Sequence, residues 1–371
     1  MRKILFIMSS LGGGGAEKVL ITLLRYFDYS RYSVDLCLIN KVGVYVKDVP
    51  AEVSLITLYD DISSLKAKVE YNLYTHFGLD FLERSRMSRK VGRSYDAIIS
   101  FCEGRSLKFH SYVTDRTENN ISWVHTDMKN NHHSVGKIFS VSDELKAYSK
   151  MQTIVCVSET SDMQFGKQFP NIKVPRRVIV NPIPKDEITS YSDKNRTTKT
   201  FVITTVGGLR PEKGFDRVIR LASHLKRKGY DFHINIIGEG SCRSNLEALI
   251  EQEQVGDCVS LLGFVNPPYK EMSQSDLFIN VSHVEAYPLV ICEAACLGIS
   301  VVATRTAGGI ALLGESEYGL LVEQNDESIL DGVERLIIDG QLRKHYQKKA
   351  LELAGTFDVN TIIQHIYALI G

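Results

Sequence analysis

The sequence contains no apolar run of about 18 residues, the length that a helix needs to cross a bilayer. Only a few apolar residues precede Ser9 and Ser10 at the start, which predicts a strand rather than a signal peptide. The seven cysteines form no Cys-x-x-Cys pair, and an odd number favours free thiols in a reducing compartment. These absences indicate a cytoplasmic protein.

Nothing in the composition indicates disorder, because 44% of the 371 residues are hydrophobic and 24% are charged. This length predicts two or three domains. The net charge is zero, but residues 1–185 hold 26 Lys or Arg against 19 Asp or Glu, a balance of +7, and residues 186–371 have a balance of −7. We therefore expect an anionic partner for the first half. We do not expect a nucleic-acid partner.

The first half has one dense basic stretch. Its basic residues are Arg84, Arg86, Arg89, Lys90 and Arg93. Its apolar residues are Phe81, Leu82, Met87 and Val91. The pattern fits either contact with an anionic membrane surface or an ordinary solvated helix face.

Short apolar strands alternate with helical patterns, which is typical of parallel sheets joined by crossover helices. The expected strands of the first half are Ile4–Met8, Val34–Ile39, Val53–Thr57, Ala97–Phe101, Ile121–Val124, Thr153–Val157 and Val178–Val180. Those of the second half are Phe201–Val206, Phe232–Ile237, Val259–Leu262, Leu277–Val281 and Ser300–Ala303. The expected helices are Ala16–Phe27, Phe215–Lys228, Arg243–Gln252, Leu289–Leu297, Ser328–Ile338 and Val359–Ile370. Residues 185–199 are polar and aperiodic, so they predict a linker between an α/β domain of residues 1–184 and another of residues 200–356.

Ligands of such sheets bind at the carboxyl ends of the strands. The four glycines at residues 12–15 follow the first strand and open the first helix, where the backbone can approach a phosphate. A dinucleotide-binding enzyme would use the same device, but it also needs an acidic residue after the second strand, and Asn40 and Lys41 follow Ile39 there. A flexible turn is the alternative.

A second glycine turn occupies the equivalent place in the second half. Residues 206–214 read Val-Gly-Gly-Leu-Arg-Pro-Glu-Lys-Gly and lead into a helix, which puts Arg210 and Lys213 beside a helix N-terminus. Two cations there can neutralise a diphosphate leaving group. The alternative is a surface loop with ordinary charges.

Glu285 and Glu293 are eight residues apart, a spacing that other glutamate pairs of the chain share. Their context distinguishes them, because Glu285 follows an expected strand and Glu293 lies early in the next helix. Carboxylates accept hydrogen bonds from sugar and ribose hydroxyls. The amides of Leu289 and Val290 would open that helix toward a phosphate. Two solvated glutamates are the alternative.

Trp123 and His125 end an expected strand of the first half. A histidine there can bind a sugar hydroxyl or carry a proton, and a structural histidine is the alternative. No Asp-x-Asp sequence occurs, which counts against a sugar transferase that holds its donor through a divalent metal.

With these motifs in hand, the chain resembles the retaining glycosyltransferase family 4 of the GT-B fold over nearly its whole length. The motifs that carry the resemblance are Gly14-Gly15-Ala16-Glu17, Trp123–His125, Asn181-Pro182, Pro211–Gly214 and the block from Ser282 through Glu285 to Glu293. The resemblance implies two Rossmann-like domains whose parallel sheets face each other across an inter-domain cleft. It also implies that the last helix, within residues 357–371, crosses back to the N-terminal, acceptor-binding domain.

The resemblance also implies roles for single residues. Lys213 would pair with the diphosphate, Glu285 would hold the transferred sugar, and Glu293 would take the ribose hydroxyls. The remaining donor-binding positions are Gly14, Gly15, Gly208, Arg210, Gly263, Phe264, Val265, Leu289 and Val290. His125 would position the sugar near the anomeric carbon, so His125, Lys213 and Glu285 are the expected catalytic residues.

Two departures from the family pattern stand out. Gly208 lies where the family usually has an arginine, and Arg210 is the nearest residue that could supply this charge. Losing one such contact to a transition state costs about 2.7–4 kcal/mol at comparable sites. Ala311 and Leu312 stand where the family commonly has a Pro-Glu pair after the glycines at 308 and 309.

We expect a retaining, metal-independent hexosyltransferase that needs no cofactor. Its donor would be a UDP- or GDP-sugar, and its acceptor a lipid-linked saccharide of surface polysaccharide synthesis at the inner face of the cell membrane. The alternatives are a catalytically inactive nucleotide-binding scaffold of the same fold, a sugar-nucleotide epimerase or phosphorylase, and an NAD-dependent enzyme.

Overall fold

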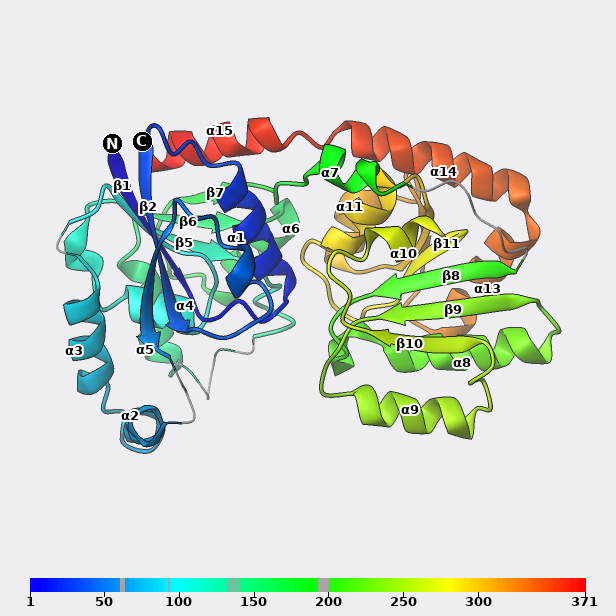
Figure 1. Cartoon of the computed structure of the whole chain (residues 1–371), viewed down its shortest axis with the longest axis horizontal. Coiled ribbons are helices and arrows are strands. Elements are labelled where there is room, and N and C mark those ends of the chain that lie inside the picture. Colours follow the sequence, from blue (N-terminus) through cyan, green and yellow to red (C-terminus); the bar gives the residue numbers. More distant parts are fainter. Residues whose placement is uncertain (61–63, 93, 133, 135–137, 139, 193–199) are drawn as a thin grey trace. The chain divides into compact units, whose positions relative to one another are not determined.

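The computed structural model describes residues 1–60, 64–92, 94–132, 134, 138, 140–192 and 200–371. It divides into two compact units, Met1–Pro182 with Asn360–Gly371, and Ile183–Val359. Each unit is built on its own parallel sheet (Figure 1). Within the described residues, no helix combines the length and hydropathy that crossing a bilayer requires.

The first unit has a seven-stranded sheet in the order β3-β2-β1-β4-β5-β6-β7. Its strands are β1 (Arg2–Met8), β2 (Tyr32–Asn40), β3 (Ser54–Tyr59), β4 (Ala97–Ser100), β5 (Asn120–Val124), β6 (Thr153–Cys156) and β7 (Arg176–Val178). The order along the chain reverses between β1 and β4, so a switch point lies between their carboxyl ends. The first six expected strands are confirmed, and β7 begins two residues before the expected position.

The described residues of this unit include seven α-helices. They are α1 (Gly15–Arg25), α2 (Leu65–Phe77), α3 (Phe81–Lys90), α4 (Arg105–His110), α5 (Val141–Ser149), α6 (Glu159–Gln168) and α15 (Val359–Ile370). Leu5 and Ile7 of β1 pack against Met87 of α3 and Phe109 of α4. The terminal helix α15 belongs to this unit, because the ring of Tyr367 stacks on that of Tyr32 with centroids 4.8 Å apart.

The second unit has a six-stranded parallel sheet in the order β10-β9-β8-β11-β12-β13. Its strands are β8 (Phe201–Val206), β9 (Phe232–Ile237), β10 (Val259–Gly263), β11 (Leu277–Asn280), β12 (Ser300–Thr304) and β13 (Leu320–Val322). Its helices are α7 (Lys185–Ser190), α8 (Phe215–Arg227), α9 (Arg243–Gln252), α10 (Tyr269–Ser273), α11 (Leu289–Cys296), α12 (Ala307–Leu313), α13 (Asp326–Ile338) and α14 (Gly340–Gly355).

Strand alternation sorts the core of the second unit into two layers. Leu277 and Ile279 of β11 join one apolar cluster, which α8, α9 and α13 cover. Phe278, between them, joins the opposite cluster with Ile291 of α11 and Ala350 of α14. Successive side chains of a strand point to opposite faces, so a continuous apolar run fits a sheet covered on both sides.

The structure corrects the expected linker. Residues Lys185–Ser190 form α7, and Ile188 is fully buried in the core of the second unit. Burial of the Ile188 side chain stabilises the packing of this segment although its other residues are polar, because the polar side chains can remain in water. Residues 193–199 of the expected linker lie outside the described residues. The short strand β13 and the helices α2, α4, α5, α6, α7, α10, α12 and α14 were not predicted.

Candidate active site

The candidate site of the second unit lies where β8 and β11 are neighbours. The strand order along the chain reverses there, so the loops that follow these two strands start side by side at the carboxyl edge of the sheet. After β8 come the glycine turn and the single 3-10 turn Pro211–Lys213, and after β11 comes the loop that carries Glu285.

An ion pair joins the two loops. Nζ of Lys213 lies 2.6 Å from Oε1 of Glu285, and the two side chains are 21% and 10% exposed. The Ser282 hydroxyl donates to the same oxygen at 2.8 Å. The structure therefore brings together a cation and a carboxylate that lie 72 positions apart in the chain.

Backbone contacts fix the two loops against each other. Gly214 has a φ of +67°, and a Cβ there would stand 2.6 Å from the carbonyl oxygen of Val281, so this close approach requires glycine. The N–H of His283 donates to the Glu212 carbonyl at 2.8 Å. The buried guanidinium of Arg217 donates to the Val281 carbonyl at 3.2 Å. The position of Lys213 relative to Glu285 is thus set by the main chain.

Helix α11 begins beside this pair. Leu289 and Val290 are its first two residues, and its N-cap, Pro288, provides no side-chain hydrogen bond. The first amides of a helix have no acceptor within the helix, so they favour an anion. Glu293 lies in the second turn of α11 and is only 4% exposed.

Gly308 of α12 holds the Glu285 loop from the other side. Its N–H donates to the Glu285 carbonyl at 2.8 Å. A Cβ on Gly308 would lie 2.6 Å from Cδ of Pro288 and 2.8 Å from the carbonyl carbon of Ala286. This contact depends on the glycine alone, so it is present although Ala311 and Leu312 replace the Pro-Glu pair of the family pattern.

Arg210 lies close to Gly208. A Cβ on Gly208 would stand 3.4 Å from Nε of Arg210, so the guanidinium occupies the space beside residue 208. The same Nε lies 3.0 Å from the Glu212 carboxylate, and the Arg210 side chain is 56% exposed. The structure thus places a cation next to the position where the family pattern has one.

The expected base-binding segment follows β10. Gly263 has a φ of +76°, and its carbonyl accepts from the N–H of Gly238 at 2.8 Å. Phe264 is exposed and Val265 is half-buried. Because β10 lies two strands from β8, this segment is about 10 Å along the sheet edge from the glycine turn.

In the first unit, a carboxylate already occupies part of the glycine loop after β1. Oε2 of Glu17 accepts from the amide of Gly13 at 2.8 Å and also from that of Gly14. Gly15, the first residue of α1, is exposed. An anion that used the amides of Gly13 and Gly14 would displace the Glu17 carboxylate, a competition that the sequence did not predict.

His125 follows β5 in the first unit. Its backbone N–H donates to Oε2 of Glu103 at 3.0 Å. The centroid of its ring lies 5.0 Å from the ring centroid of Phe101 and 6.5 Å from that of Trp123. Its Nε2 is buried and has no hydrogen-bond partner among the described residues. Burial lowers the pKa of His125 to about 4, although the Glu103 carboxylate raises it. The imidazole is therefore neutral near pH 7.

The sequence analysis gave no role to several residues that support the site. They are Ser282, Thr304, Gln324, Arg217 and Gly308. The Thr304 hydroxyl donates to the Ser282 carbonyl at 2.6 Å, and the Gln324 amide oxygen accepts from Arg217 at 2.9 Å. Ser282, Thr304 and Gln324 end or closely follow strands, a signal that could have found them. No comparable position at a strand end predicts the contact that Arg217 makes with Gln324.

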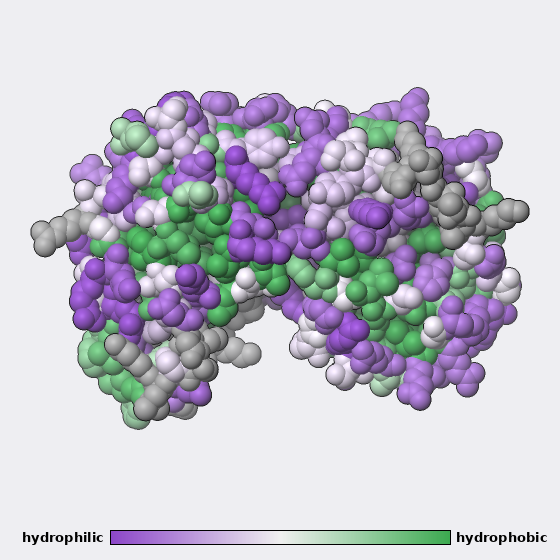
Figure 2. Space-filling view, in the orientation of Figure 1, coloured by the Kyte–Doolittle hydropathy of each residue, from purple (hydrophilic) through white to green (hydrophobic). Residues whose placement is uncertain are grey.

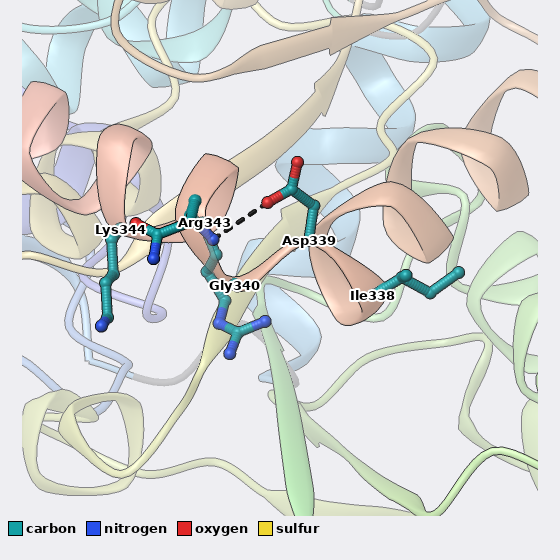
Figure 3. A pocket seen from close by; sticks show the side chains of 6 residues that line it. Ile338, Asp339, Gly340, Arg343 and Lys344 are labelled. Carbon is teal, nitrogen blue, oxygen red and sulfur yellow. Dashed lines mark hydrogen bonds between the residues drawn. The ribbon is translucent and has the colours of Figure 1, made fainter.

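A hollow elsewhere in the second unit does not belong to this site. It lies where α13 meets α14, and Asp339, Gly340, Arg343 and Lys344 are among its lining residues (Figure 3). The Asp339 carboxylate caps α14 by accepting from its first amides, so these amides are not open to an anion. The Arg343 guanidinium covers the ring of Phe201, the first residue of β8, so the hollow lies at the amino end of the strand.

Comparisons with known proteins agree on one family. The model of the family described as glycosyl transferases group 1 matches residues 187–353. The Campylobacter jejuni N-acetylgalactosamine-N,N'-diacetylbacillosaminyl-diphospho-undecaprenol 4-alpha-N-acetylgalactosaminyltransferase is 29% identical over 379 residues, which is 96% of each chain. The alpha-D-kanosaminyltransferase of Streptomyces kanamyceticus is 30% identical over 290 residues, 73% of this chain and 74% of that one.

Solved structures share the fold. HepE of Anabaena, in complex with UDP and glucose, has a TM-score of 0.77 at 20% identity, with 99% of both chains covered. WaaG, a glycosyltransferase involved in lipopolysaccharide biosynthesis, has a TM-score of 0.73 at 16% identity, again with 99% of both chains covered. The expected GT-B fold, with two Rossmann-like parallel sheets, is confirmed.

Proposed function

Because this chain belongs to the group 1 glycosyltransferases, we propose that it transfers a hexose from a UDP- or GDP-sugar, with retention of configuration, to a lipid-linked saccharide in surface polysaccharide synthesis. The Campylobacter jejuni relative is named for a saccharide acceptor on undecaprenyl diphosphate, which supports the choice of acceptor. A structural neighbour has been solved with UDP-glucose, which supports a nucleotide-sugar donor. Such an acceptor would hold the enzyme at the cytoplasmic face of the membrane.

The observation that carries the proposal is the pair of Lys213 and Glu285 at the switch point, beside the first amides of α11. Without substrate, the two side chains neutralise each other. A donor would separate them, because its diphosphate attracts Lys213 and its sugar hydroxyls donate to Glu285. Leu289 and Val290 would offer amides to the phosphate, and Glu293 would accept from the ribose hydroxyls.

In the proposed reaction, the bond between the anomeric carbon and the diphosphate oxygen breaks as the acceptor oxygen bonds to the same face of that carbon. The acceptor proton passes to the departing diphosphate oxygen, so no enzyme nucleophile is needed. Lys213 stabilises the negative charge that develops on the diphosphate. Charge neutralisation by protein side chains and helix amides is our reason for proposing a metal-independent transfer without a cofactor.

Arg210 supplies the second cation of this proposal. Its guanidinium fills the space beside Gly208 and is largely exposed, so it can turn to a diphosphate without leaving a buried position. Its partner Glu212 would be released, as Glu285 is released by Lys213. This geometry favours an active transferase over a scaffold that has lost its cation.

His125 contributes from the first unit as a neutral imidazole. Its buried Nε2 has a hydrogen-bonding capacity that the described residues leave unused, and a hydroxyl of the transferred sugar would satisfy it. The Glu103 carboxylate holds the backbone of His125, so it positions the ring.

The proposal is tested by thermal unfolding with UDP, GDP, ADP and NAD. A ligand at about 100 times its dissociation constant stabilises a protein by about 2.7 kcal/mol. We expect UDP or GDP to raise the midpoint of the wild type, and Glu293→Ala to reduce that rise. Glu247→Ala, an exposed change on α9, is the matched control and should leave the rise intact.

The other outcomes separate the alternatives. A rise with NAD alone would favour a dehydrogenase, and no rise with any nucleotide would overturn the proposal. Nucleotide binding without turnover of UDP- or GDP-hexoses would favour the inactive scaffold. A changed sugar nucleotide without transfer would favour an epimerase.

A further inference from the structure

Two side chains hold the carboxylate of Glu285, and both act on the same oxygen. Nζ of Lys213 lies 2.6 Å from Oε1, and the Ser282 hydroxyl donates to Oε1 at 2.8 Å. Within the described residues, no hydrogen bond reaches the second oxygen, Oε2. Oε2 therefore keeps its full capacity to accept hydrogen bonds from a ligand.

The two partners of Oε1 differ in how they respond to a donor. In the proposed reaction the diphosphate draws Lys213 away from Glu285, because a diphosphate carries more negative charge than one carboxylate. Ser282 has no net charge, so the diphosphate does not attract it in this way. Among the described residues, the Ser282 hydroxyl is then the only side-chain group that still holds Glu285.

The backbone of Ser282 is itself held by its neighbours. Ser282 is 2% exposed. Its carbonyl accepts from the Thr304 hydroxyl at 2.6 Å and from Nε2 of Gln324 at 3.3 Å. Its N–H donates to Oδ1 of Asn280 at 3.4 Å. Because hydrogen bonds hold this residue on both sides, its hydroxyl reaches Glu285 from a fixed position.

A buried arginine connects this support to helix α8. Arg217 is 8% exposed, and its guanidinium donates to Oε1 of Gln324 at 2.9 Å and to the Gln324 carbonyl at 3.0 Å. Gln324 in turn donates to the Ser282 carbonyl. Arg217 lies four positions after Lys213, so the segment of Lys213 and the loop of Glu285 are joined by a second route. This route does not depend on the ion pair, and the loop can keep its place when the ion pair opens.

The support lies inside the second unit, where surface features do not reveal it. Thr304 is fully buried, and Ser282 is nearly so. In Figure 2, hydrophobic and hydrophilic residues are interspersed where Figure 1 places β8, β9 and β10. The basic stretch of the first unit is no clearer a feature, because its Met87 and Val91 are buried in the core and Arg93 lies outside the described residues.

We propose that Ser282 is a positioning residue for sugar transfer. Its hydroxyl keeps Oε1 of Glu285 in place after the donor has separated Lys213 from it, so that Oε2 meets a hydroxyl of the transferred sugar. Ser282 does not touch the donor and acts through Glu285 alone. The inference rests on the proposed function, because it requires a nucleotide-sugar that opens the ion pair.

The first test compares Ser282→Ala with a matched control, Ser300→Ala. Ser300 is fully buried in the same unit, and its hydroxyl also makes one hydrogen bond, to the Asp276 carbonyl at 3.0 Å. It is the first residue of β12, so it lies at the amino end of the sheet, away from the site. We expect both variants to lower the unfolding midpoint by about 2–4 °C, the effect of one lost hydrogen bond. Affinity for UDP and GDP should be unchanged in both.

The two variants should differ in their kinetics. With the UDP- or GDP-hexose that the wild type turns over, Ser282→Ala should lower kcat/KM for the donor about tenfold to a hundredfold, the range of one hydrogen bond to a charged group. Ser300→Ala should keep the wild-type value. A serine that only stabilised the loop would lower the midpoint and leave kcat/KM unchanged. An unchanged kcat/KM for Ser282→Ala, or an equal fall for Ser300→Ala, would therefore overturn the proposal.

A second test needs no donor. Lys213→Met and Ser282→Ala each leave Oε1 of Glu285 with one partner, and the double variant leaves it with none among the described residues. We expect the double variant to lose more stability in denaturant unfolding than the two single variants together. Lys213→Met/Ser300→Ala should show additive losses. Additive losses for Lys213→Met/Ser282→Ala as well would overturn the proposal.

These tests separate the inference from the proposed function. A wild type that transfers no sugar from any UDP- or GDP-hexose would overturn both. Normal transfer by the wild type and by Ser282→Ala alike would overturn the inference alone.

Discussion

Replacing Lys213 by methionine separates its role in catalysis from its role in the fold. Methionine keeps most of the length of the side chain and removes the charge. In the free enzyme, the change leaves the Glu285 carboxylate with the Ser282 hydroxyl, which donates to it at 2.8 Å. Breaking a fully buried ion pair costs about 3–5 kcal/mol, and an exposed pair is worth about 0–1 kcal/mol. Because Lys213 is 21% and Glu285 10% exposed, we expect the free energy of unfolding to fall by roughly 1–2 kcal/mol.

The effect on turnover should be larger. If Lys213 stabilises the charge that develops on the leaving diphosphate, its removal raises the barrier by about 2.7–4 kcal/mol, and kcat falls about a hundredfold to a thousandfold. The assay measures release of the nucleoside diphosphate at saturating donor, below the unfolding midpoint of the variant. Lys213→Arg keeps the charge and should retain more activity than Lys213→Met.

A kcat for Lys213→Met within tenfold of the wild type would refute this reasoning, because the ion pair would then be structural only. Glu285→Gln gives an independent check. It removes the partner of Lys213 but keeps the shape of the side chain, so a loss of stability without a loss of turnover would limit Glu285 to holding the two loops together.

Three further predictions concern other parts of the two units. Burial lowers the pKa of His125 from 6.5 to about 4, so the folded state favours the neutral ring. The stability that the neutral ring contributes is complete above about pH 6.5 and is lost as the pH falls towards 4. Denaturant unfolding should therefore show a smaller loss of stability between pH 7 and pH 5 for His125→Gln than for the wild type, and equal losses would contradict the assignment. Arg210→Ala should lower kcat/KM by about tenfold or more while stability changes by less than about 0.5 kcal/mol, because the side chain is exposed; unchanged kinetics would exclude Arg210 from the site. Gly308→Ala places a Cβ 2.6 Å from Pro288 and should lower stability by about 1–3 kcal/mol and weaken nucleotide binding, whereas Gly355→Ala, which meets open space, should do neither.

The fold was predictable wherever an apolar run ended at a polar or glycine residue. β8 and β9 have the expected bounds, because Gly207 and Gly238 follow their last residues directly. β13 is only three residues long, too short to show a period. A single residue separates α13 from α14, so Asp339 is both the C-cap of one helix and the N-cap of the next. The Asp339-Gly340 pair is a turn signal that could have marked this junction.

The candidate site was predictable only in part, for a reason that lies in the sheet. Strand ends place Lys213 and Glu285 at the same edge, but the sequence does not tell that β8 and β11 are neighbours there. The adjacency of β8 and β11 brings Lys213 and Glu285 together. The contacts that hold the two residues in place cannot be predicted from the sequence near them. The backbone carbonyl of Glu285 accepts a hydrogen bond from the amide of Gly308 in α12, a helix that begins 22 residues later. No local sequence pattern identifies Gly308 as that partner. Gly308, whose Cβ would meet Pro288, is therefore informative about function, because it fixes the backbone of Glu285 without touching the lysine. It follows that Gly308→Ala should disturb the Glu285 loop first, and that its effect on turnover should largely disappear when Glu285 has already been replaced by glutamine.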